Sequence, residues 1–163
     1  MRMAHTFTMQ HYKTAANKRA LSNFTSRLHW QGHFMQKFED ESRMEFEPVN
    51  KAYQGLEKDR DEHLIKAWQE GKTGVPLVDA CMRYLAATGW LNFRMRAMVA
   101  SFLTYLLWQP WQPGAEWFQR CLIDFDTGIN HQQWQMQAGT VGWHANPARS
   151  RHRRRTRLVA TRS

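Results

Sequence analysis

The spacing of apolar residues predicts helices along most of the chain. Between residues 17 and 38, Leu21, Phe24 and Leu28 follow one another at intervals of three and four, the period of one helix face. The same period predicts helices at 61–69, 76–88, 92–108, 114–123 and 127–138. No segment shows the sustained alternation of a half-buried strand. The predicted fold class is therefore all-α, a helical bundle with short connections.

The residues at the ends of these segments support the helix assignment. Pro76 opens a helix well because the first turn does not use its missing N–H, and Asp79 adds a negative charge close behind it. Gly89 suits the position after the last turn. Pro110 cannot continue the helix predicted at 92–108, so that helix is expected to end before it.

Composition divides the chain into three regions. Residues 1–16 have no clear period and are expected to form a loose lead-in, and 17–146 form the predicted helical domain. Residues 147–163 contain seven arginines and no acid, and removing them leaves 16 basic residues against 14 acidic ones. The formal charge of +9 therefore belongs largely to this basic, Arg-rich tail. Such a run binds phosphates without sequence preference, but here we expect a disordered or out-of-frame segment.

The remaining composition predicts a cytoplasmic protein with a hydrophobic core. Hydrophobic residues make up 42% of the chain. The N-terminus lacks the apolar run of a signal peptide, and no segment reaches the ~18 apolar residues of a membrane span. Cys81 and Cys121 are not spaced as a disulfide scaffold or a thiolate cluster. His29 and His33 lack the glutamate of the helical zinc motif, so no metal is expected.

Two longer segments resemble a known family. The sequence AWQEGKTGVPLVDACMRYLAATGWLNFRMRAMVASFL, followed by CLIDFDTGINHQQWQMQAGT, is similar to the FAD-binding helical domain of photolyases and cryptochromes. The similarity extends over about residues 21–144. It implies a light-driven flavoprotein with the cofactor FAD. Photolyases use reduced FAD to return an electron to pyrimidine dimers in damaged DNA, their expected partner, whereas cryptochromes signal.

The resemblance also implies a set of site residues. The expected catalytic residues, for electron transfer and lesion stacking, are Trp30, Trp111 and Trp134. The residues expected to bind FAD are Phe24, Arg27, Arg96, Asp124, Asp126 and Asn130. The residues expected to contact DNA are Trp30, Gln31, Phe93, Arg94 and Met136.

The chemistry of these residues suits the roles that the resemblance implies. Asp124 would pair with Arg96, and Asp126 would lie near the polar edge of the isoalloxazine ring. Asn130 would face the flavin N5, where an amide can both donate and accept hydrogen bonds as a redox centre changes protonation. From the residues alone, an ordinary salt bridge between helices is an equally good reading of the arginine–aspartate pair.

Several positions depart from the family pattern. Arg27 stands where photolyases often carry a lesion-contacting glutamate, Phe93 replaces an asparagine, and Met136 replaces a second lesion-facing tryptophan. Lys58 occupies the place of the outermost tryptophan in the electron-transfer chain. These differences weaken the case for dimer repair and favour a divergent subgroup or a cryptochrome-like role.

The chain also lacks the antenna-binding α/β domain of the family and the stretch that cradles the FAD phosphates. We therefore expect a truncated fragment, a partial FAD-binding domain. Whether it is an enzyme, as the deoxyribodipyrimidine photo-lyases are, stays open at this point. Two alternatives remain, a non-catalytic basic helical nucleic-acid-binding protein and a non-functional remnant.

Overall fold

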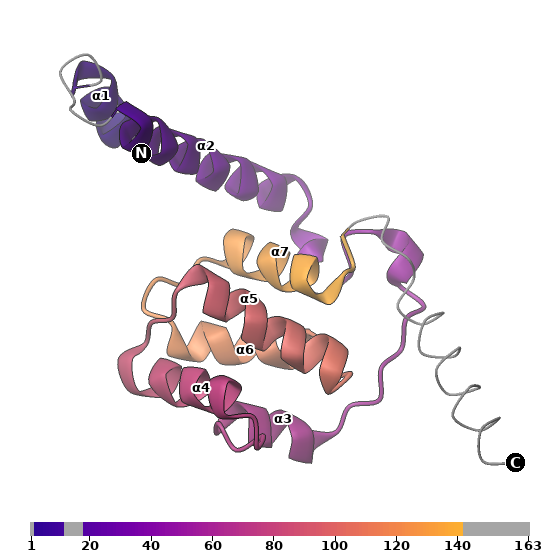
Figure 1. The fold of residues 1–163 in the computed structure, drawn as a ribbon. Coiled ribbons are helices and arrows are strands. Elements are labelled where there is room, and N and C mark those ends of the chain that lie inside the picture. Colours follow the sequence, from indigo (N-terminus) through magenta and orange to yellow (C-terminus); the bar gives the residue numbers. More distant parts are fainter. Residues whose placement is uncertain (1, 12–17, 142–163) are drawn as a thin grey trace, which may run out of the picture. The chain divides into compact units, whose positions relative to one another are not determined.

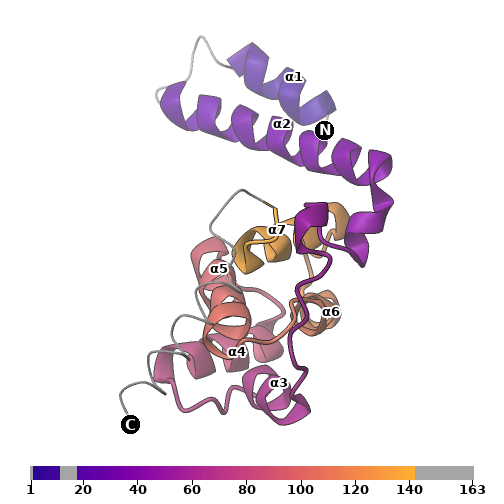
Figure 2. The same cartoon turned by 90° about the vertical axis from the view of Figure 1, so that its right-hand side faces the viewer.

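The computed structural model describes residues 2–11 and 18–141, and every regular element in this part of the chain is helical (Figures 1 and 2). This confirms the predicted all-α fold class. The chain forms two compact units, Met1–Ser42 and Arg43–Ser163. The domain boundaries expected at 16/17 and 146/147 stay predictions, and the basic tail at 147–163 lies outside the described residues.

The described part of the first unit consists of α1 (Arg2–His11) and α2 (Lys18–Asp40). Helix α2 confirms the helix predicted at 17–38. Helix α1 lies where a loose lead-in was expected, and Met3 and Phe7 are one helical turn apart in it. Two such positions are too few for a periodicity argument, which needs a window of about 11 residues or more. No residue of α2 is buried within the structure.

The second unit contains the remaining helices in close agreement with the sequence pattern. Its first elements are two short 3-10 helices, η1 (Ser42–Glu45) and η2 (Lys51–Tyr53). Ser42, the first residue of η1, is the last residue of the first unit. Then follow α3 (Glu62–Gln69), α4 (Pro76–Thr88), α5 (Phe93–Ser101), η3 (Phe102–Leu106), α6 (Gln112–Cys121) and α7 (Thr127–Ala138). Helix α5 lies between α4 and α7, and α6 packs against α7 and α3 (Figure 1). No described helix combines the length and the apolar character needed to cross a membrane.

The helix predicted at 92–108 is not a continuous α-helix. After Ser101 it becomes the π-helical turn η3, in which the Leu107 N–H donates to the Phe102 carbonyl at 3.0 Å. Trp108 then adopts a left-handed backbone with φ 59°, a conformation that is uncommon for a large side chain. Pro110 prevents the chain from continuing as a helix, so the helical segment that begins with α5 ends with η3.

The core of the second unit is built around three aromatic side chains. Trp68 of α3 stacks on Phe118 of α6 with ring centroids 6.2 Å apart, and both rings meet Trp134 of α7 edge-on. All three side chains are buried. The indole N–H of Trp68 donates to the Val99 carbonyl at 3.0 Å, which ties α5 to the same cluster. Edge-to-face and offset contacts of this kind add to the stabilisation from burial.

Asp79 closes the turn that precedes α4. Its carboxylate accepts hydrogen bonds from the Thr73 N–H at 2.8 Å, the Thr73 hydroxyl at 2.6 Å and the Gly74 N–H at 3.0 Å. Burial raises the pKa of Asp79, but the hydrogen bonds from Thr73 and Gly74, aided by the charge of Arg83, outweigh it and hold the pKa below its usual value. Asp79 is thus a structural residue of the second unit.

We expect Asp79→Asn to lower the free energy of unfolding by about 1 kcal/mol at neutral pH, because the amide cannot accept all three hydrogen bonds. The pKa of Asp79 is lower in the folded than in the unfolded chain, so its contribution is present above the unfolded value and is lost as the pH falls through the folded value. Urea unfolding at about pH 7 and about pH 3 should therefore show a gap between the two proteins that narrows in acid. Asp59→Asn, at an exposed position, is the matched control. A gap independent of pH would contradict this assignment.

Candidate functional site

Helix α7 carries three of the expected site residues, and both of its ends are firmly defined. Asp126 is the N-cap, and its carboxylate accepts the Ile129 N–H at 3.1 Å. Gly139 ends the helix in the left-handed conformation with φ 72°. The boundaries match the predicted helix at 127–138. Capping fixes the register at which Asn130 and Trp134 leave the helix one turn apart.

Arg96 and Asp124 form the ion pair that was expected from the sequence. One terminal nitrogen of Arg96 lies 3.0 Å from each carboxylate oxygen of Asp124, and the Arg96 Nε–H donates to the Leu91 carbonyl. The Asp124 side chain is half exposed, so the pair contributes little stability by itself. Its effect is to hold the loop before α7 against the start of α5.

Asn130 retains unused hydrogen-bonding capacity. Its side-chain N–H donates to the Ala115 carbonyl of α6 at 3.3 Å. Within the described part of the chain, its side-chain oxygen receives no hydrogen bond. The residue is only half-buried. An amide held from one side by α6 can therefore offer its oxygen to a ligand on the other side.

Trp134 is buried with its indole N–H unpaired. Only 2% of the residue is exposed, and its Nε1 has no acceptor among the described residues. The edge of its ring lies directly over Gly114 of α6, close enough that a Cβ there would overlap it. A buried donor without a partner is rare in folded proteins and calls for an explanation, such as water or a bound group.

Trp111 is buried where α6 begins, beside α7. It precedes α6 as its N-cap residue and meets His131 of α7 edge-on, with ring centroids 5.9 Å apart. The Phe125 ring meets the same histidine edge-on, with ring centroids 6.3 Å apart. His131 is itself buried, and its Nδ1 hydrogen-bonds with the Thr127 carbonyl. The surroundings of both tryptophans are therefore largely aromatic and apolar.

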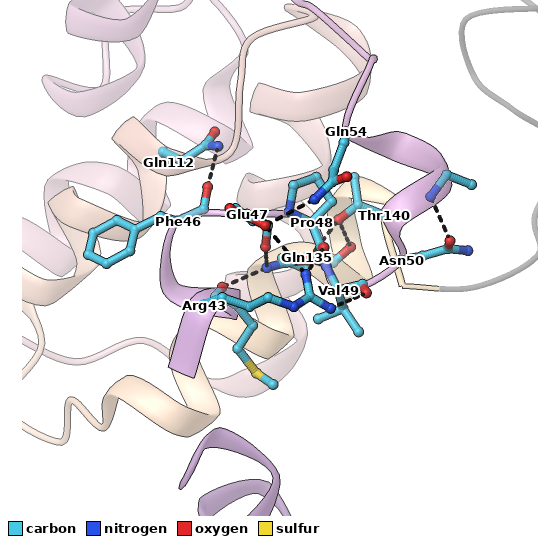
Figure 3. Close-up of polar contacts among 12 residues, drawn as sticks. Arg43, Phe46, Glu47, Pro48, Val49, Asn50, Gln54, Gln112, Gln135 and Thr140 are labelled. Carbon is cyan, nitrogen blue, oxygen red and sulfur yellow. Dashed lines mark hydrogen bonds and ion pairs between the residues drawn. The ribbon is translucent and has the colours of Figure 1, made fainter. Parts of the chain in front are cut away.

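Gln135 fixes helix α7 to residues 44–49, near the start of the second unit (Figure 3). Its amide donates to the Met44 and Glu47 carbonyls at 2.7 and 2.9 Å, and its oxygen accepts from the Val49 N–H at 2.6 Å. The Thr140 hydroxyl donates to the same oxygen at 3.2 Å. The side chain is fully buried, and its donors and its oxygen are all used.

The other expected site residues lie on the surface of the units to which they belong. Phe24, Arg27, Trp30 and Gln31 are exposed on α2, where the Trp30 ring contacts His33 and Phe34. Phe93, Arg94 and Met136 are exposed in the second unit. The structure brings together Arg96 with Asp124, and Asp126, Asn130 and Trp134 along α7; the functional roles of all these residues stay predictions.

Sequence reasoning missed two residues that support this site. Gln135 looks like any helical glutamine, and its partners are about 90 positions away in the chain. Trp68 was used only as part of a motif, although its ring packs directly on Trp134. The density of tryptophan near both positions was the available signal, but it could not indicate which rings meet.

The residues of the second unit fit one part of a flavin. The polar edge of an isoalloxazine ring presents N–H and carbonyl groups, and the free oxygen of Asn130, the carboxylate of Asp126 and the guanidinium of Arg96 are complementary to them. The unpaired indole N–H of Trp134 is a further donor. The pyrophosphate and adenine of FAD would need residues outside this set.

These features define an all-helical domain in which a polar, capped helix end adjoins buried tryptophans. Residues 24–157 match the family described as the FAD binding domain of DNA photolyase. The chain belongs to this family, whose cofactor is FAD.

Named relatives agree with this assignment. The chain is 41% identical to a cryptochrome DASH of Natronomonas pharaonis over 77% of its own length and 26% of the relative. It is 46% identical to a deoxyribodipyrimidine photo-lyase of Thermus thermophilus over 61% of its length and 24% of the relative. A photolyase of Sulfolobus tokodaii, solved with two FAD molecules, superposes with a TM-score of 0.73 and 31% identity over 86% of this chain and 33% of that one. The chain thus spans about a quarter of the length of the two sequence relatives.

We expect Gly114→Ala to destabilise the second unit by about 1–3 kcal/mol, because the new methyl group would overlap the Trp134 ring and approach Leu103 to 2.8 Å. Alanine favours helices over glycine by up to about 1 kcal/mol, so any net loss of stability is a lower bound on the cost of the overlap. Gly55→Ala is the matched control, since nothing lies within 4 Å of its added Cβ. Urea unfolding followed by tryptophan fluorescence measures both. Equal stability of the two variants would show that α6 and α7 can separate at no cost.

Proposed function

We propose that this chain forms the isoalloxazine-binding part of a light-dependent electron-transfer flavoprotein related to photolyases and cryptochromes. The observation that carries the proposal is the arrangement on α7, where a half-buried amide, Asn130, lies one turn before a buried tryptophan, Trp134. The match to the FAD-binding family over most of the chain supports it and disfavours the two alternatives that the sequence left open.

The proposed binding residues are Asn130, Asp126 and the Arg96–Asp124 pair. Bound FAD would supply light absorption and one-electron chemistry. Asn130 would offer its free oxygen to the ring edge while Ala115 holds its N–H. Asp126 caps α7 through one oxygen, so the second can accept from the cofactor. Arg96 and Asp124 would keep this rim in place. Phe24 and Arg27 of α2 stay proposed FAD-binding residues.

The proposed electron donors are Trp134 and Trp111. Indole is the most readily oxidised large apolar side chain, and both rings are buried among aromatic neighbours, which exclude water and fix their positions. Trp134 would donate first because it shares α7 with Asn130. The His131 ring packs against Trp111, and the Phe125 ring packs against His131. Each step would move one electron toward the flavin site and leave the tryptophan that donated it oxidised.

We assign DNA as the partner of the surface residues. Trp30 and Phe93 present exposed rings that can stack on bases, Arg94 supplies a charge for phosphates, and Gln31 and Met136 complete the set. The position of a lesion-contacting glutamate is taken by Arg27, which disfavours dimer repair and favours a cryptochrome-like role. Electrophoretic mobility assays on DNA with and without a pyrimidine dimer test whether the chain prefers the lesion, as dimer repair requires and a cryptochrome-like role does not.

The primary test is flavin retention by the purified chain. After incubation with FAD and gel filtration, we expect a flavin band between ~350 and ~500 nm that remains with the protein. Asn130→Ala should lower the retained fraction severalfold, whereas Gln119→Ala, an exposed amide on α6, should not. Absence of retained flavin in the unaltered chain, with FAD in excess, would refute the proposal.

Electron donation is tested separately on the flavin-loaded chain. Trp134→Phe preserves a buried ring but removes the oxidisable indole, so blue-light bleaching of the flavin band should slow about tenfold or more, the effect of about 1.4 kcal/mol or more on the barrier. Trp90→Phe is the control, because Trp90 is exposed and outside the proposed pathway. Equal bleaching rates in the two variants would exclude Trp134 as the first donor.

A further inference from the structure

Lys58 holds a positive charge over the ring of Trp108, three residues before Trp111 in the chain. Its ammonium donates to the Thr104 carbonyl at 2.7 Å and the Gln109 carbonyl at 3.2 Å. It also lies over the ring of Trp108, 4.5 Å from the ring centroid. This is the position at which the sequence departs from the family by lacking a tryptophan.

The surrounding backbone fixes this charge in place. Thr104 belongs to η3, and Gln109 follows it, so Lys58 satisfies carbonyls left open where the helix ends. Gln109 is buried, and its side chain accepts the Asp61 N–H and donates to the Leu107 carbonyl. The segment that carries Lys58 is thereby tied to the segment that carries Trp108. A partly dehydrated, immobile ammonium acts on its neighbours more strongly than one in water.

The charge lies over the ring of Trp108, which is close in the chain to Trp111. Lys58 and Trp111 line the same cavity of about 90 Å³. Trp108 is three residues from Trp111, so their Cα atoms are at most about 11 Å apart. A cation attracts the face of a neutral indole, but it repels an indole that has lost an electron. The contact that stabilises Trp108 in its resting state therefore opposes its oxidation.

We propose that Lys58 is an electrostatic barrier that confines oxidation to Trp134 and Trp111 and keeps it from reaching Trp108. The proposal rests on the proposed function of these tryptophans. With FAD bound to supply the light-driven oxidation, Trp134 would give up one electron, Trp111 would pass one electron to Trp134, and the oxidised state would stay on Trp111. Lys58 binds neither partner of these steps; it is a positioning residue that determines where the chain of donors ends.

The test uses the full chain without flavin, so its result does not depend on cofactor binding. A ruthenium tris(bipyridine) complex, photo-oxidised with a cobalt(III) quencher, removes single electrons from the protein. Peptide mass spectrometry then measures oxidation at Trp108 and Trp111. We expect Lys58→Met to raise oxidation of Trp108 about threefold or more, the scale of a partly buried cation–π contact. Lys58→Arg keeps the charge and should stay at the unaltered level, as should Lys72→Met on an exposed loop.

A greater exposure of Trp108 in Lys58→Met would also raise its oxidation, and hydroxyl-radical labelling distinguishes this cause. That reagent responds to accessibility and not to the oxidation potential. The proposal requires unchanged radical labelling together with raised one-electron oxidation. An equal rise in both, no rise in either, or an equal rise in Lys58→Arg would overturn it. Loss of flavin retention would refute the proposed function and leave this electrostatic result standing.

Discussion

The close approach of α6 and α7 at Gly114 is the constraint on which the second unit depends. Because Gly114 has no side chain, the edge of the Trp134 indole can approach the backbone of α6 and the ring can still meet Phe118 and Trp68. The same ring is the proposed first electron donor. Packing and the proposed function therefore share one side chain, and its position depends on the absence of a Cβ at Gly114. Interiors packed at crystal-like density allow no compensating shift without cost.

Gln135 complements this apolar contact with a polar one. An amide with no exposed surface is costly unless its donors and acceptors are used, and here the backbone of residues 44–49 and Thr140 use them (Figure 3). The neighbouring residues Trp134 and Gln135 thus contact two different partners: Trp134 packs against α6, and Gln135 binds the backbone of residues 44–49. With both satisfied, α7 cannot rotate about its axis, and the direction in which Asn130 presents its oxygen is set.

The sequence predicted the regular part of this arrangement because local signals determine it. Pro76 and Gly89 bracket α4, and Asp126 and Gly139 bracket α7, as helix-end chemistry requires. The Arg96–Asp124 pair was expected from the family resemblance, and the structure forms it. The π-helical turn at 102–106 did not, since residues outside the turn close its carbonyls: Lys58 donates to the Thr104 carbonyl, and the Gln109 N–H donates to the Leu103 carbonyl. Nor did the anchoring of Gln135, because hydrogen bonds across about 90 residues leave no periodic trace.

The departures from the family pattern fall on the accessible parts of this structure. Arg27, Phe93 and Met136 are exposed, and Lys58 is half-buried at the end of η3, whereas Trp134 and Trp111 match the pattern and are buried. A change at an exposed residue alters what the domain contacts and leaves its packing intact. A change at Trp134 would disturb both, because its ring forms part of the core. Divergence of the surface is therefore physically separable from the proposed electron transfer between these buried tryptophans. A relative with this core and a different surface would keep both rings in place while contacting another partner.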